Sequence, residues 1–246
     1  LHLPAPEVEY HVGKAEPTGH QKAMVQELSK RAAQVHSGRV NPKQDNMLKI
    51  TSDGRKLGLD QRIINPMLPD DPNSKVNRCV DNILRIWKEG AADKLTQLVF
   101  CDISTPRAKA AAQQDKAAMA AGDKAGGDLH ALTDLLDGVE PDAPFSIYED
   151  IRDKLIAGGI PAQEIAFIHD ANTPARKKEL FSRMRQGRVR VLMGSTFKMG
   201  AGMNVQDRLI ALHDLDCPWR PGDLEQRKGR IVRQGNRNEK VHIYRY

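Results

Sequence analysis

The sequence predicts an α/β fold in which a parallel sheet carries helices on both faces. Short apolar runs of strand length recur from about residue 95 to the C-terminus, and helical stretches separate them. Parallel strands need long crossover connections, which are usually helices, and strands covered on both faces read as nearly continuous apolar runs. No repeat of 20–50 residues is visible, which excludes solenoid and propeller architectures.

The first 90 residues are expected to be mainly helical. Apolar side chains at Met24, Val25, Leu28 and Ala32 have the spacing of one helix face. We expect a short strand at 8–12 and helices from 17 to the mid-thirties, over 44–64, and from Ser74-Lys75 to Gly90. The sequence therefore predicts a helical lead-in at 1–90, with a boundary near residue 90.

The remainder, 91–246, is expected to hold the sheet. Strands are predicted at 95–103, 165–168, 189–193, 209–213 and 241–246, and helices at 145–157, 174–186 and 222–233. The Ala/Gly/Lys-rich stretch 108–127 has almost no large apolar side chain. Such a stretch buries little surface, so we interpret the region near 105–144 as an insertion.

Composition limits the class of protein. The net charge of +6 and the pI near 9.2 favour a polyanionic partner. Three widely spaced cysteines show no metal-binding spacing, so reduced, buried thiols and a cytoplasmic location are expected. No run approaches the ~20 apolar residues of a membrane span, so no membrane partner is expected. The start at Leu1, without Met, suggests a cut from a longer protein.

Several polar motifs directly follow predicted strands. These motifs are Ser104-Thr105, Gly194-Ser195-Thr196 and Asp214-Leu215-Asp216. Ligands of open parallel sheets bind beyond the carboxyl ends of the strands, so we expect these motifs at one functional edge. Ser195, Thr196, Lys198 and Ser104 offer hydroxyl and cationic contacts to a nucleic-acid backbone; the alternative is a polar loop.

Two residues of the following loops have open interpretations. Asn204 has an amide that can hydrogen-bond a ribose hydroxyl, or can simply cap the next turn. Trp219 lies between two prolines, and core packing is favoured over stacking on a base.

The stretch Gln226–Arg233 reads Q-x-x-G-R-x-x-R. Arg230 and Arg233 are three residues apart, which places them on one face of a helical turn. Paired guanidiniums suit a phosphoryl group, whose charge they neutralise by planar contacts. Gly229 permits close approach to the backbone. The alternative is a surface helix with solvated charges.

Together these motifs resemble superfamily-two helicases. The order G-S-T-x-x-x-G-A-G-x-N, D-x-P-W-x-P and Q-x-x-G-R-x-x-R-x-G is similar to motifs V and VI, and most similar to Swi/Snf-type DNA translocases. Further sequence motifs of that family are resembled by four other segments: 98–102, Ile168-His169-Asp170, Asn65-Pro66 and Ser74-Lys75. The amino-acid sequence of these motifs also resembles that of large helicase–DNA methyltransferase fusions of phages and mobile elements, which implies a bacterial or phage origin.

The resemblance implies a C-terminal RecA-like lobe, a three-layer α/β fold. Arg230 and Arg233 would reach the γ-phosphate of ATP, and Gln226 would lie near the nucleotide or the attacking water. Gly202, Asn204 and Gly229 would border the nucleotide, while Ser195 and Thr196 would touch the backbone of DNA, which we expect to be duplex.

The chain lacks a phosphate-binding G-x-x-x-x-G-K-[ST] loop and a D-E-x-H-type strand end. We therefore expect an N-terminal RecA-like lobe to bind Mg²⁺ and to cradle the phosphates of ATP.

Two rival functions remain. A degenerate lobe within a methyltransferase–helicase protein would bind nucleic acid without an ATPase role, but the intact Gln226, Arg230 and Arg233 argue against it. An unrelated doubly wound nucleotide-binding enzyme is disfavoured because no strand leads into a G-x-G-x-x-G.

Overall fold

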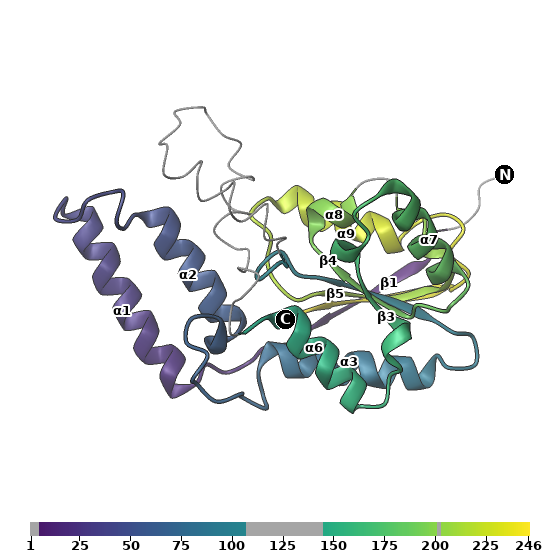
Figure 1. Ribbon diagram of the computed structural model, residues 1–246. Coiled ribbons are helices and arrows are strands. Elements are labelled where there is room, and N and C mark those ends of the chain that lie inside the picture. Colours follow the sequence, from purple (N-terminus) through teal and green to yellow (C-terminus); the bar gives the residue numbers. More distant parts are fainter. Residues whose placement is uncertain (1–4, 107–144, 201–202) are drawn as a thin grey trace. The chain divides into compact units, whose positions relative to one another are not determined.

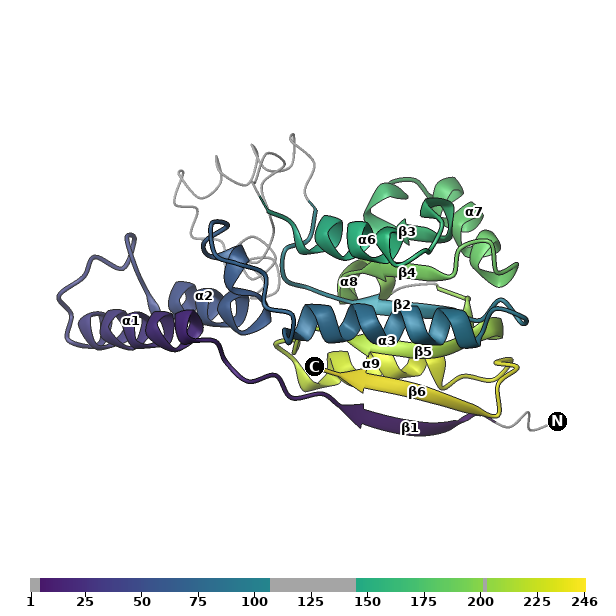
Figure 2. The ribbon, with the colours of Figure 1, turned by 90° about the horizontal axis from the view of Figure 1, so that it is seen from below.

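In the computed structural model, which describes residues 5–106, 145–200 and 203–246, the strands form one parallel sheet. Its spatial order is β1-β6-β5-β2-β4-β3 (Figure 2). The strands are β1 (Glu7–Val12), β2 (Thr96–Phe100), β3 (Ile165–Phe167), β4 (Val191–Gly194), β5 (Leu209–Asp214) and β6 (Lys240–Arg245). Every neighbouring pair is parallel, which confirms the predicted α/β class.

Helices cover both faces of this sheet (Figure 1). One face carries α3 (Lys75–Glu89) and α6 (Ile147–Ala157). The other carries α7 (Pro174–Arg185), α8 (Thr196–Gly200) and α9 (Pro221–Ile231). The predicted strands and helices of 145–246 are all present, with ends that shift by one or two residues. The short helix α8 has no counterpart among the predicted elements.

The core follows from the apolar spacing. On α3 the buried side chains are Val76, Cys79, Val80, Ile83 and Ile86, which recur every three or four residues and face the sheet. On the opposite face, fully buried side chains of the strands pack against those of α7 and α9: Leu98, Leu192, Leu212, Met184 and Ile231. Helix α7 begins where capping predicts, since the Thr173 hydroxyl accepts from the Arg176 backbone N–H and Pro174 occupies the first turn.

The described residues form two compact units. The first comprises 5–15, 75–102, 148–200 and 203–246, and contains the sheet. The second comprises 16–74, 103–106 and 145–147. The predicted boundary at residue 90 therefore needs correction, because β1 and α3 belong to the sheet unit. Strand β1 pairs with β6 from the far end of the chain, a contact that local sequence patterns do not report. The predicted insertion lies mostly outside the described residues.

The second unit contains α1 (Gly19–His36) and α2 (Met47–Leu59), followed by a 3-10 turn at Gln61–Ile63. Thr18 and Gln21 form a capping box at the start of α1. Arg31 of α1 ties the two helices together, since it donates to Asp45 and to Asp53 of α2. The helix predicted over 44–64 is shorter than expected, because α2 spans only Met47–Leu59. Within the described ranges, no helix has the length and apolar character needed to cross a membrane.

Candidate functional site

The centre of the candidate site is the buried side chain of Arg227 on α9, which is 1% exposed. Its Nε donates to the Thr196 hydroxyl at 2.8 Å. Its Nη1 donates to Asp214 Oδ1 and to the Asp216 carbonyl, both at 3.1 Å. Its Nη2 donates to Asp102 Oδ2 at 2.8 Å and to Asp216 Oδ1 at 3.0 Å. All five N–H donors of the guanidinium are therefore satisfied.

This network joins the carboxyl ends of three neighbouring strands. Asp102 follows β2, Thr196 follows β4, and Asp214 ends β5. Two direct links reinforce it: Asp102 accepts from the Thr196 backbone N–H and hydroxyl, and Asp216 accepts from the Asp102 backbone N–H. The expectation that three strand-end motifs meet at one edge is confirmed for those after β4 and β5, which Arg227 connects. Ser104-Thr105 belongs to the second unit.

The electrostatics of the network are dominated by its carboxylates. Burial by itself lowers the pKa of Arg227, but the carboxylates of Asp216, Asp102 and Asp214 together raise that pKa above its usual value. Burial raises the pKa of Asp214, and Arg227 opposes this. Three carboxylates therefore share the one buried guanidinium, and loss of that guanidinium would leave buried negative charge less well compensated.

The crossover connections that follow β2 and β4 run in opposite directions along the sheet. From β2 the chain crosses to the β3 side of the sheet through α6, whereas from β4 it crosses to the β5 side through α8. Adjacent strands whose connections leave in opposite directions create a crevice at their carboxyl ends, where ligands of open α/β sheets bind. Asp102 and Thr196 lie at this switch point.

The hydroxyl groups that we predicted to contact nucleic acid are largely committed within the protein. Thr196 is 3% exposed and its hydroxyl is held by Asp102 and Arg227. Ser195 is 7% exposed and accepts from the Lys198 backbone N–H, as an N-cap does. Free hydroxyls at both positions were therefore a wrong expectation, because strand-end groups satisfy nearby buried polar atoms first. The Lys198 side chain is exposed.

Ser104 also differs from its predicted role. Its side chain is fully buried, its φ of 62° lies in the left-handed region, and its hydroxyl accepts from the Ile147 backbone N–H. It belongs to the second unit rather than to the sheet unit. A nucleic-acid contact through this hydroxyl is thus not supported by its surroundings.

The two predicted phosphate-binding arginines occupy different backbone elements. Helix α9 ends at Ile231, and Val232 leaves the helical region with φ −83° and ψ 76°. Arg233 therefore lies beyond the helix, and the predicted shared helical face was wrong. The two side chains still influence each other: burial and then the charge of Arg233 lower the pKa of Arg230. Arg233 is exposed and donates to the Met203 carbonyl at 3.2 Å.

The other predicted nucleotide-binding residues lie at the surface or outside the described part. Gln226 is exposed on α9, one turn before Arg230. Gly229 is also exposed, and a Cβ added there would meet no described atom within 4 Å. Asn204 is exposed, and its carbonyl accepts from Arg185 at 2.8 Å. Gly202 lies outside the described residues.

Two further expectations need revision. Trp219 is 37% exposed, so its predicted role in core packing is wrong. Cys217 is exposed, although the other two cysteines are buried as expected.

Sequence interpretation overlooked Arg227 because a charged residue beside Gln226 looks like part of a solvated helix face. The three aspartates at or just after strand ends could have indicated a buried arginine, since buried carboxylates require a cation nearby.

Comparisons with known proteins locate the similarity in the same region. Residues 146–235 match the family described as helicase conserved C-terminal domain. No curated protein sequence matches the chain. The crystal structure of the C-terminal part of the Fun30 ATPase domain is 13% identical, with a TM-score of 0.59, over 99% of this chain and 85% of that one.

Two structures of the DUF1998 helicase MrfA, one bound to DNA and one bound to DNA and AMPPNP, are 14% and 13% identical. Their TM-scores are 0.39 and 0.38, each over 68% of this chain. The chain spans only 18% and 17% of the length of those proteins. Residues 146–235 are therefore similar to a helicase C-terminal domain, and the sheet unit has the RecA-like α/β fold.

Proposed function

We propose that this chain is the C-terminal motor lobe of an ATP-dependent DNA translocase of the Swi/Snf type. The observation that carries the proposal is the pair Arg230, in the last turn of α9, and Arg233, two residues beyond the end of that helix. They belong to the segment that is similar to helicase C-terminal domains.

The arginine pair has the chemistry of a site for a phosphoryl group. Two guanidiniums that repel each other are stabilised by an anion placed between them, and the γ-phosphate of ATP supplies spread negative charge. Gln226 lies one helical turn before Arg230 and would approach the nucleotide or the attacking water from the same helix. Gly229, Asn204 and Gly202 would border the nucleotide.

The same reasoning assigns the remaining parts of the motor to another lobe. A phosphate-binding loop is absent from the sequence, so a second RecA-like lobe would hold Mg²⁺ and the other phosphates of ATP. Arg227 acts within this scheme as a positioning residue, because it fixes the loops after β2, β4 and β5.

DNA would be contacted through its phosphates. Lys198 carries an exposed charge on α8, directly after the switch-point residues, and the chain has a net charge of +6. Ser195 and Thr196 would contribute by positioning the start of α8 rather than through free hydroxyls. A helicase–methyltransferase fusion of a phage or mobile element is the context that fits the sequence motifs.

The test replaces the arginines in a polypeptide that joins this chain to a phosphate-binding lobe. Arg230→Ala and Arg233→Ala should each lower kcat for DNA-stimulated ATP hydrolysis while ATP affinity changes little. An arginine finger contributes roughly 10³–10⁵ in rate, and a smaller loss is expected where two arginines share the charge. Arg188→Ala, at an exposed position in the same domain, is the matched control.

Unchanged steady-state hydrolysis in both variants would contradict the proposal. If the joined protein binds DNA but hydrolyses no ATP, the lobe is the degenerate nucleic-acid-binding module instead.

A further inference from the structure

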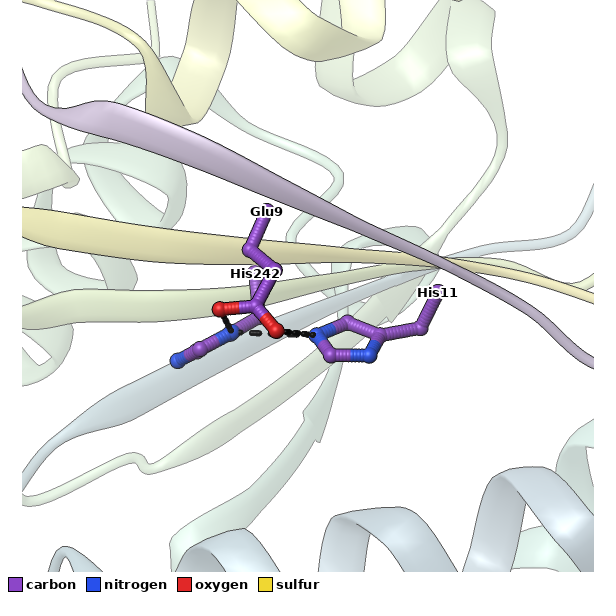
Figure 3. Close-up of side chains that lie close together, drawn as sticks. All are labelled: Glu9, His11 and His242. Carbon is purple, nitrogen blue, oxygen red and sulfur yellow. Dashed lines mark hydrogen bonds and ion pairs between the residues drawn. The ribbon is translucent and has the colours of Figure 1, made fainter.

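Three side chains at the edge of the sheet converge on one point (Figure 3). Glu9 and His11 lie on β1, two residues apart, so both project from the same face of the strand. His242 lies on β6, in register with Glu9. All three are partly exposed, and their ligand atoms lie within 4.8 Å of one another.

The individual distances describe a compact triangle. The Nε2 of His11 lies 3.1 Å from Nδ1 of His242. The Glu9 carboxylate oxygens lie 3.8 Å from His11 Nε2 and 3.9 Å from His242 Nδ1. In a tetrahedral zinc site with bonds of 2.0–2.1 Å, neighbouring ligand atoms are separated by about 3.3 Å. The triangle therefore needs only a small contraction on the carboxylate side.

We propose that Glu9, His11 and His242 form a binding site for a divalent transition metal of the zinc class. Two imidazoles and one carboxylate are a ligand set that zinc adopts with a fourth position open to water. The set disfavours Mg²⁺ and Ca²⁺, because those ions prefer oxygen ligands.

The geometry of the ligands is held by the fold. The hydrogen-bonded pairing of β1 with β6 fixes the backbone on both sides of the site. The ring of His11 stacks on Tyr244 with a centroid distance of 4.4 Å and an interplanar angle of 12°. Because Tyr244 lies two residues after His242 on the same strand, one element supplies both a ligand and a support for the other ligand's ring.

Lys240 is the competitor for the site. Its Nζ lies 2.9 Å from Oε2 of Glu9 and therefore neutralises the carboxylate that the metal would use. The other carboxylate oxygen, Oε1, is the one nearer to His11. Metal binding would displace Lys240 or share the carboxylate with it, so removal of Lys240 should strengthen the site.

A bound metal would stabilise the pairing of the edge strand β1 with β6. The described part of the sheet pairs β1 with β6 alone. A metal held by ligands from both strands would bind the folded pairing and not the separated strands, so it would raise the melting temperature.

The test is calorimetric titration of the chain, free of any purification tag, with Zn²⁺ and separately with Mg²⁺. We expect one Zn²⁺ per chain, a higher Tm with Zn²⁺, and no response to Mg²⁺. His11→Gln and His242→Gln should each weaken Zn²⁺ binding by more than about tenfold, since loss of outer-shell partners alone costs ~10–100-fold. The matched controls are His20→Gln, at an exposed histidine, and Cys217→Ser, at the exposed thiol.

Lys240→Met provides a second test that leaves all three ligands in place, and it should tighten Zn²⁺ binding. Co²⁺ bound to the chain should show the intense visible absorption of a tetrahedral site. The proposal is overturned if Zn²⁺ does not bind, if binding survives His11→Gln unchanged, if Cys217→Ser or His20→Gln abolishes it, or if Lys240→Met leaves the affinity unchanged or weaker.

Discussion

Replacement of Arg227 by methionine should destabilise the sheet unit strongly. The side chain is fully buried and donates five hydrogen bonds to four residues at the carboxyl edge of the sheet. Methionine fills a similar volume without charge. The substitution removes the guanidinium that the carboxylates of Asp102, Asp214 and Asp216 share, and leaves Asp214 with Arg245 Nε at 3.7 Å.

The magnitude follows from the burial of the cluster. Removal of one partner of a buried ion pair costs about 3–5 kcal/mol, because the remaining charge stays uncompensated. Total stabilities of single domains are about 5–15 kcal/mol, so the loss is a large share of the whole. Arg227→Lys should cost less, because it keeps the charge but provides three donors in place of five.

The stability of the Arg227→Met variant should depend on pH in a way that tests the role of charge. Burial raises the pKa of Asp214 and Arg227 opposes this rise, so that pKa should rise further above the unfolded value of about 3.9 once Arg227 is removed. The folded variant then binds more protons than the unfolded chain, so its stability falls as pH rises through this range. The destabilisation should therefore be smaller near pH 5 than near pH 8.

Urea denaturation followed by circular dichroism at both pH values measures this effect, with Arg188→Met at an exposed position as control. A loss below about 1 kcal/mol for Arg227→Met, or a loss that does not depend on pH, would refute a charge-balancing role for Arg227.

Three further predictions concern the same unit. Burial, with a contribution from Arg85, lowers the pKa of His213 to about 3. Between about pH 6.5 and 3 the unfolded chain therefore binds one proton more than the folded chain, and stability falls by about 1.4 kcal/mol per pH unit as pH drops through that window. His213→Gln should flatten the acid side of the stability curve. Gly194→Ala should cost about 1–3 kcal/mol, because the new Cβ would overlap Ile168 Cγ2 and crowd Met199. Gly229→Ala meets no described atom within 4 Å and should be neutral or stabilising. DNA binding by the chain should be weak, with Kd ~10⁻⁴–10⁻⁶ M, independent of sequence and sensitive to salt, and Lys198→Ala should reduce the salt slope by about 1.

Each of these has a clear contrary result. An unchanged acid limb in His213→Gln would show that His213 is not held neutral in the folded state. Equal melting temperatures for Gly194→Ala and Gly229→Ala would contradict the close packing at the end of β4. Tight binding to one DNA sequence, or binding that ignores salt, would indicate a recognition module rather than a motor lobe.

The buried histidine illustrates how far packing goes beyond sequence. His213 lies in a strand that the apolar run Leu-Ile-Ala-Leu predicts correctly. Its Nε2 bonds Gln97 Oε1 at 2.9 Å, and the Gln97 amide is oriented by its donation to the Ile83 carbonyl. The proton of His213 therefore sits on Nε2, and Nδ1 accepts from the Tyr246 hydroxyl. Nothing local to residue 213 reveals this chain of partners.

The sequence by itself determined most of the helices and strands, though not α8, and the edge of the sheet where the motifs after β4 and β5 gather. Helix starts such as Thr173-Pro174 and the apolar period of α3 are encoded within a few neighbouring residues, and parallel strands must end at the same edge. The motif order also located the segment that is similar to helicase C-terminal domains.

Only the tertiary structure decided which side chains meet. The pairing of β1 with β6 brings Glu9 and His11 to His242, and the burial of α9 places Arg227 among three aspartates. The same packing commits the Thr196 hydroxyl and leaves Arg233 beyond the end of its helix. Local patterns specify backbone conformation, but the partner of a polar group depends on which distant residues the folded chain brings within hydrogen-bonding reach.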